Sequence, residues 1–156
     1  MELLLSAKGI SKSFQGRKVL DDIEIEIKKS EIIAISGASG AGKTTLVRGT
    51  LQYLGWKDVV TSPTYTLCEE YEIDNKLLLH VDLYRIESQE DVEVLNLDRE
   101  TFNQKIVFIE WPENLQIDRQ EDVIINLEHD KQARCVSLKC KDNNIESSIK
   151  TYYENN

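Results

Sequence analysis

Apolar and polar positions along the chain follow two patterns that predict two kinds of β-strand. Residues 2–31 predict β structure, and within them residues 23–27 alternate isoleucine with glutamate, which is typical of a strand with one buried face. Short and almost continuous apolar runs follow, and such runs are typical of parallel strands buried on both faces. These runs are residues 32–35, 77–82 and 106–110.

Helices and shorter strands are expected between and after these runs. Residues 44–54 predict a helix that closes near Gly55. Residues 87–95 and 98–104 predict two acidic amphipathic helices, separated at Asn96, a residue type that tolerates a left-handed break. Further strands are expected in four segments, of which the last two form a pair: residues 59–60, 67–73, 122–127 and 134–138.

The segment with the most specific chemistry is residues 32–46, IIAISGASGAGKTTL. An apolar strand leads into the pattern Gly-x-x-x-x-Gly-Lys-Thr and then into a helix, which is the arrangement of a phosphate-binding P-loop. Glycines let the loop turn its N–H groups toward an anion, and the start of the helix adds to the attraction. We expect Lys43 to contact the β- and γ-phosphates and the Thr44 hydroxyl to bind Mg²⁺. The expected nucleotide contacts along the loop are Gly37, Ser39, Gly40, Ala41, Gly42, Lys43, Thr44 and Thr45.

Two of the apolar runs end in a carboxylate, Asp82 and Glu110. The carboxyl ends of parallel strands share the sheet edge where ligands bind in open α/β folds, so we expect both acids beside the P-loop. One acid is expected to hold Mg²⁺, directly or through water, and the other to orient the attacking water. The sequence leaves open which of the two carboxylates contacts the metal directly. We therefore predict a P-loop NTPase fold, a three-layer α/β sandwich with a central mixed, largely parallel sheet, in which Lys43, Asp82 and Glu110 are catalytic.

The loop at residues 61–66, TSPTYT, lies between the helix and the first acidic strand end. Pro63 fixes its own φ and biases the preceding residue toward an extended shape, so a shaped loop is expected here. Its hydroxyls, Thr64 among them, are candidates to sense a γ-phosphate, as switch loops do. The alternative interpretation is an ordinary polar turn.

Composition limits the remaining possibilities. The length of 156 residues suits one ATPase domain, expected over residues 1–140, followed by a polar tail at 141–156. Three cysteines without a C-x-x-C pair argue against a disulfide scaffold or a zinc site and favour the reducing cytoplasm. No apolar run approaches membrane-spanning length. The net charge of −9 is concentrated in the second part of the chain, which argues against autonomous binding of nucleic acid.

Four segments in order resemble one family: GASGAGKTTLVRG, SPTYTLCEEY, HVDLYRI and IEWPENL. This is the bacterial TsaE (YjeE) family of ATPases in tRNA threonylcarbamoyladenosine biosynthesis, and the match spans roughly residues 32–138. The resemblance implies ATP with Mg²⁺, slow hydrolysis in isolation, a complex with the TsaD and TsaB proteins, and access to tRNA only through that complex. It implies that Thr44 and Glu110 form the Mg²⁺ site and that Asp82 is a second important acid. It also matches Trp111 to the family's tryptophan after the glutamate.

The resemblance further implies that Arg134 lies near the nucleotide base, but the N-terminal part departs from the family. Residues 10–37 resemble the start of an ABC transporter ATPase, where an aromatic at the position of Phe14 stacks on adenine. Phe14 is therefore a candidate for base stacking, and the alternative is a core side chain. The sequence also has Ala38-Ser39 where the family usually has Asp-Leu, and Asn96 where it usually has Gly.

Other functions compete with this interpretation. An ABC ATPase fragment fits the N-terminal segment, but the chain has no LSGGQ-like signature. A GTPase fits poorly, because residues 75–78 lack the aspartate of N-K-x-D. A small-molecule P-loop kinase would use Arg85 to clamp phosphate, whereas the alternative for Arg85 is a surface ion pair. A nucleotide-gated binding module is the non-enzymatic alternative.

Overall fold

The computed structural model describes residues 3–14, 17–28, 32–97, 104–114, 122–130 and 133–140. The elements in chain order are β1 (Leu3–Phe14), β2 (Arg17–Lys28), β3 (Ile32–Gly37), α1 (Lys43–Tyr53), β4 (Cys68–Ile73), β5 (Lys76–Asp82), α2 (Gln89–Val94), β6 (Gln104–Glu110), a 3₁₀ turn η1 (Pro112–Asn114), β7 (Val123–Asp130) and β8 (Ala133–Cys140).

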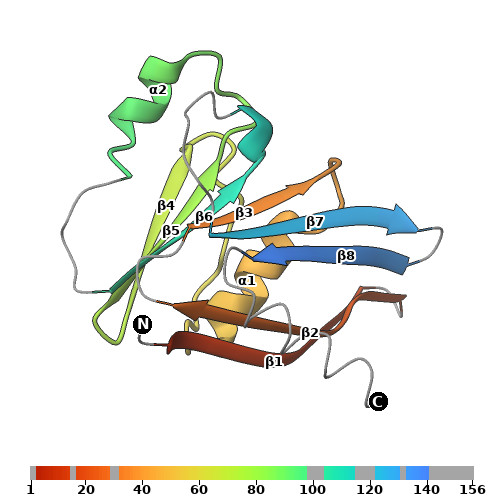
Figure 1. Cartoon of the computed structure of the whole chain (residues 1–156). Helices are drawn as coiled ribbons and strands as arrows, with labels where there is room; N and C mark the ends of the chain where they lie inside the picture. Colours follow the sequence, from red (N-terminus) through yellow and green to blue (C-terminus); the bar gives the residue numbers. More distant parts are fainter. Residues whose placement is uncertain are drawn as a thin grey trace.

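Six strands form one mixed sheet in the order β4-β5-β6-β3-β7-β8 (Figure 1). The four central strands are parallel, while β4 and β8 join the two edges in antiparallel orientation. The central strands correspond to the apolar runs of the sequence, since a strand covered on both faces has no polar side to present. The strands β1 and β2 form a separate antiparallel pair beside α1 and β8.

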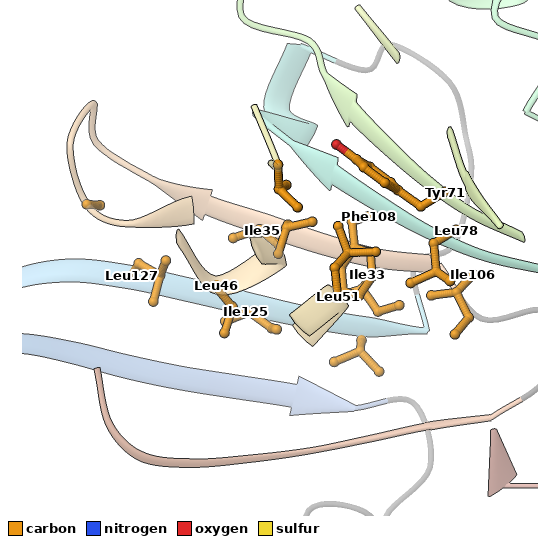
Figure 2. Packing of buried hydrophobic residues seen from close by; sticks show 14 residues of the cluster. Ile33, Ile35, Leu46, Leu51, Tyr71, Leu78, Ile106, Phe108, Ile125 and Leu127 are labelled. Carbon is orange, nitrogen blue, oxygen red and sulfur yellow. The ribbon is translucent and has the colours of Figure 1, made fainter. Parts of the chain in front are cut away.

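The two faces of the sheet are covered by different helices, which gives three layers. On one face, Leu46 and Leu51 of α1 pack against side chains of β3, β6 and β7, including Ile33, Phe108 and Ile125 (Figure 2). On the other face, Val92 of α2 belongs to a second cluster of buried residues with Leu77, Leu79, Val81, Leu83, Leu97, Val107 and Ile109. The predicted fold class, a three-layer α/β sandwich with a mixed and largely parallel sheet, is confirmed.

Most predicted elements lie where the pattern placed them. The strands at 67–73, 77–82 and 106–110, the helix at 44–54 and the antiparallel pair β7–β8 are confirmed. The helix expected at 87–95 is shorter, and Asn96 has the left-handed φ of 45° that its residue type suggested. The helix expected at 98–104 falls largely outside the described residues, and its last position already belongs to β6. The expected tail at 141–156 also lies outside them.

The short strand predicted at residues 59–60 is wrong. The carbonyl oxygen of Val60 accepts a hydrogen bond from Arg48 Nε at 3.1 Å. The Val60 side chain packs in the core beside α1, whereas Val59 is 84% exposed. The Val60 carbonyl is therefore satisfied by a side chain and not by a neighbouring strand.

Candidate nucleotide-binding site

The P-loop joins the end of β3 to the start of α1, and its backbone requires glycine. Gly37, Gly40 and Gly42 have φ values of 138°, 75° and 108°, a region that other residues rarely adopt. A Cβ atom at Gly37 would collide with the carbonyl oxygen of Leu127 on the neighbouring strand β7. Gly42 is the N-cap of α1, which has no side-chain cap. The first amides of the helix are therefore not capped by a side chain at this position.

Lys43, the first residue of α1, is 5% exposed. Its Nζ donates hydrogen bonds to the carbonyl oxygens of Gly37 at 2.7 Å and Ala38 at 3.1 Å. The same ammonium lies 3.8 Å from the centre of the Trp111 ring, a cation–π contact. Burial lowers the pKa of Lys43 below its ordinary value of 10.5, while the nearby acids, Glu110 first among them, act in the opposite direction.

Glu110 ends β6, and one of its oxygens is held by two other elements. Its Oε1 accepts a hydrogen bond from Thr44 Oγ1 of α1 at 2.8 Å and lies 2.8 Å from His80 Nε2 of β5. Thr44 and Glu110 are thus in direct contact, as expected. No motif in the sequence predicted this contact of His80. The available signal was the two-residue spacing to Asp82, which puts both side chains on the same face of a strand.

Asp82 ends β5 and is the direct cross-strand neighbour of Glu110. Its Oδ2 accepts hydrogen bonds from Thr64 Oγ1 at 2.6 Å and Ser62 Oγ at 3.2 Å, and its Oδ1 accepts one from the Tyr84 N–H at 3.0 Å. Two hydroxyls of the predicted switch loop therefore lie at the acidic edge of the sheet. The hydroxyl of Thr66 donates to Glu69 Oε1 instead.

These groups line a cleft with a volume of about 360 Å³. Its lining residues are Ser39, Gly40, Gly42, Lys43, Thr44, Thr45, Ser62, Thr64, Asp82, Tyr84, Glu110 and Trp111. Two residues of the expected loop contacts are not in the lining: Ala41 is fully buried, with its N–H donating to the Ala38 carbonyl, and Gly37 lies behind the loop against Leu127.

Tyr84 and Trp111 form an aromatic wall of the cleft that no sequence motif predicted. Their ring centres are 5.1 Å apart and the rings are tilted by 48°. Arg85, the candidate phosphate clamp of a kinase, lies with its guanidinium 4.7 Å from the centre of the Tyr65 ring and does not line the cleft. Phe14 is the last residue of β1 and Arg134 lies in β8 opposite His129, but both side chains are outside the described part of the structure.

The donor atoms in the cleft suit Mg²⁺. This ion prefers oxygen ligands and is usually held by one or two carboxylates together with phosphates and water. Thr44, Asp82 and Glu110 provide a hydroxyl and two carboxylates next to the Lys43 ammonium. Within the described ranges there is no group of three or more His, Cys, Asp or Glu side chains that would hold a metal by themselves. The residues present therefore fit an ion that is coordinated partly by the protein and partly by a bound nucleotide.

The family model for the "Threonylcarbamoyl adenosine biosynthesis protein TsaE" matches residues 11–136. The chain belongs to the TsaE family. The tRNA threonylcarbamoyladenosine biosynthesis protein TsaE of Haemophilus influenzae is 41% identical over 118 residues, which cover 74% of each chain. The TsaE protein of Aquifex aeolicus is 36% identical over 113 residues, covering 71% of this chain and 77% of the relative.

The fold is also similar to that of a solved structure. The crystal structure of YdiB from Bacillus subtilis superposes with a TM-score of 0.60 and 23% sequence identity, over 83% of this chain and 82% of that one. This likeness agrees with the α/β fold described above. In the ranges that the structure describes, none of the helices has the length and apolar character needed to cross a lipid bilayer.

Proposed function

We propose that this chain is a magnesium-dependent ATP hydrolase that supports threonylcarbamoyladenosine modification of tRNA. In this proposal residues 1–140 form the ATPase domain, which works in the cytoplasm in a complex with TsaB and TsaD and reaches tRNA only through that complex. Hydrolysis by the chain alone is slow. The observation that carries the proposal is the hydrogen bond between Thr44 and Glu110 inside a P-loop cleft, in a chain of the TsaE family.

In this proposal the P-loop binds the triphosphate. The loop amides and the start of α1 would surround the phosphates, because several N–H groups and the helix dipole favour an anion there. Lys43 already has its ammonium at the loop, where it bonds to the carbonyls of Gly37 and Ala38. Phosphate oxygens are stronger acceptors than these carbonyls, so Lys43 would exchange them for the β- and γ-phosphates.

The acidic edge of the sheet supplies the metal ligands and the link to the switch loop. Thr44 and Glu110 would hold Mg²⁺, directly or through water, with Asp82 supporting that shell. When bound, the ion neutralises negative charge that develops on the phosphates. Asp82 also holds Ser62 and Thr64 by hydrogen bonds. Binding or loss of the γ-phosphate and its Mg²⁺ would therefore act, through Asp82, on the conformation of the loop at residues 61–66.

The base of the nucleotide would be recognised by Phe14 through stacking and by Arg134. The positions of their strands are compatible with such roles: β1 packs beside α1, and β8 joins the sheet edge next to β7. Replacing Phe14 with Ala is expected to weaken ATP binding severalfold if the ring stacks on adenine. An unchanged dissociation constant would assign Phe14 to the core.

The decisive experiment measures ATP hydrolysis by the purified chain, alone and after assembly with TsaB and TsaD, together with threonylcarbamoyladenosine formed on added tRNA. We expect slow hydrolysis alone, faster hydrolysis in the complex and repeated rounds of tRNA modification. Lys43→Ala should abolish both while the complex still assembles. Normal hydrolysis in Lys43→Ala would contradict the site, and undiminished threonylcarbamoyladenosine after depletion of the protein would contradict the cellular role.

A further inference from the structure

His80 is a buried polar residue to which the proposed function gives no task. It lies in the middle of β5, is 0% exposed, and sits between Leu78 and Asp82 on the strand face that looks toward α1. Its Nε2 is 2.8 Å from Glu110 Oε1. Its Nδ1 is buried and has no hydrogen-bond partner among the described residues. A buried polar atom left without a partner destabilises a fold, whereas an apolar side chain at this position would avoid that cost.

The hydrogen bond that the His80 ring makes among the described residues is directed at a single atom of the expected metal site. A carboxylate oxygen accepts hydrogen bonds, so the ring donates from Nε2, and Nδ1 is the ring nitrogen left without a partner. Thr44 Oγ1 of α1 donates to the same Oε1 at 2.8 Å. Glu110 is thus held at one oxygen by donors from two separate elements, β5 and α1. Its other oxygen, Oε2, accepts no hydrogen bond within the described part of the chain.

We propose that His80 is a positioning residue for the magnesium site, acting through Glu110. Its Nε2–H and the Thr44 hydroxyl hold Oε1, which would restrict rotation of the carboxylate and leave Oε2 available as an oxygen ligand for the ion. This inference rests on the proposed function, because it gives Glu110 its role in holding Mg²⁺. Hydrogen-bonded partners of a metal ligand orient that ligand, and their loss typically weakens metal binding about 10- to 100-fold.

The test measures metal affinity separately from nucleotide affinity and from hydrolysis. Mn²⁺, used as the paramagnetic substitute for Mg²⁺, is titrated by electron paramagnetic resonance into protein saturated with ADP. His80→Leu removes the donor but keeps the bulk, and it should raise the Mn²⁺ dissociation constant about tenfold or more. His80→Gln retains an N–H donor and should recover part of the loss. Binding of ADP without a divalent ion should be unchanged in both variants.

A matched control separates positioning from general damage to the core. Leu79→Ala alters the residue that precedes His80 in β5. Leu79 is fully buried on the opposite face of the sheet, so the substitution destabilises the strand without touching Glu110. It should leave Mn²⁺ affinity unchanged. Equal Mn²⁺ affinities in wild type and His80→Leu, or an equal loss in Leu79→Ala, would overturn the proposal, as would wild-type protein that binds ADP but no Mn²⁺.

A second measurement uses wild-type protein and does not depend on variants that fold. The chain has two histidines, and His129 lies exposed on β7, away from the cleft. In nitrogen-15 spectra we expect His80 to carry a proton on Nε2 and its signal to shift when Mg²⁺ is added to protein already saturated with ADP, while the signal of His129 stays constant in that step. A ring without a proton on Nε2, or a His80 signal that does not shift, would overturn the proposal. If wild-type protein hydrolyses no ATP but His80→Leu still weakens Mn²⁺ binding as expected, only the proposed enzymatic function is contradicted.

Discussion

The hydroxyl of Thr44 donates a hydrogen bond of 2.8 Å to Glu110, a residue 66 positions further along the chain. The bond links the first turn of α1 to the end of β6, which lies beside β3 in the sheet. This bond therefore holds the P-loop and the end of β6 in a fixed relative position without a bound ligand. Such preorganisation reduces the rearrangement that a site needs when charge develops on a reacting phosphate.

Glu110→Gln should separate nucleotide binding from hydrolysis. The amide keeps the size of the side chain but loses the charge, so we expect metal-free ADP binding to remain and ATP hydrolysis to fall by at least 100-fold, in the range typical for removal of an electrostatic catalytic group. Single-turnover hydrolysis and calorimetric ADP binding provide the two measurements. Glu93→Gln on the exposed side of α2 is the control and should behave as wild type. Unchanged hydrolysis in Glu110→Gln would remove this residue from the mechanism.

Gly37→Ala should destabilise the protein more than Gly55→Ala. Both glycines have positive φ, so each substitution carries a backbone cost of about 1–2 kcal/mol. A Cβ at Gly37 also collides with the Leu127 carbonyl, whereas Gly55 has open space around it. We expect a further loss of about 1–3 kcal/mol in Gly37→Ala, the range for overpacking, measured by urea unfolding. Equal losses in the two variants would show that β7 moves away at little cost.

Thr64→Val should loosen the loop at residues 61–66. The Thr64 hydroxyl donates a 2.6 Å hydrogen bond to Asp82, and this bond joins the loop to the end of β5. Its loss should speed amide hydrogen exchange in the loop several-fold, since a hydrogen bond to a charged group contributes about 1.5–3 kcal/mol and less at a partly exposed site. Thr66→Val is the matched control, because Thr66 bonds to Glu69 and not to Asp82. Equal exchange rates in both variants would argue that Asp82 does not hold the loop.

Lys43 should make stability without nucleotide depend on alkaline pH. Its pKa is lower in the folded protein than in the unfolded chain, chiefly because burial disfavours the charged form. The unfolded chain therefore binds more protons in the window just below pH 10.5, and this group contributes a stability that increases with pH there. Lys43→Met should be more stable than wild type at pH 7, with the difference shrinking as the pH rises through that window.

The measurement for Lys43 is thermal unfolding of wild type and Lys43→Met at matched ionic strength from pH 7 to pH 10.5. Lys57→Met, at an exposed position after α1, is the control, and the difference in stability between this variant and wild type should not change with pH in the same way. A Lys43→Met variant that is less stable than wild type at pH 7 would mean that the hydrogen bonds to the loop carbonyls and the Trp111 contact outweigh the burial of the ammonium.

Local sequence pattern determined the strands, the main helix and the kind of chemistry. Apolar runs identify strands buried on both faces, and the spacing of glycines, Lys43 and Thr44 identifies a phosphate loop, because both depend on neighbours only a few residues apart. The same locality explains the error at residues 59–60. Two valines suggest a strand, but the hydrogen bond from Arg48 and the packing of Val60 beneath α1 decided the local structure.

Tertiary structure decided which of these groups meet. The strand order places β6 between β5 and β3, so Asp82 and Glu110 become direct neighbours at the edge above the P-loop. It also brings His80 to Glu110 and the Leu127 carbonyl behind Gly37. Hydrophobic burial is non-directional, and its pattern in a sequence tells which face of a strand is covered without telling which strand lies next to it. The partners of Glu110 were therefore fixed by the packing of the whole sheet against α1.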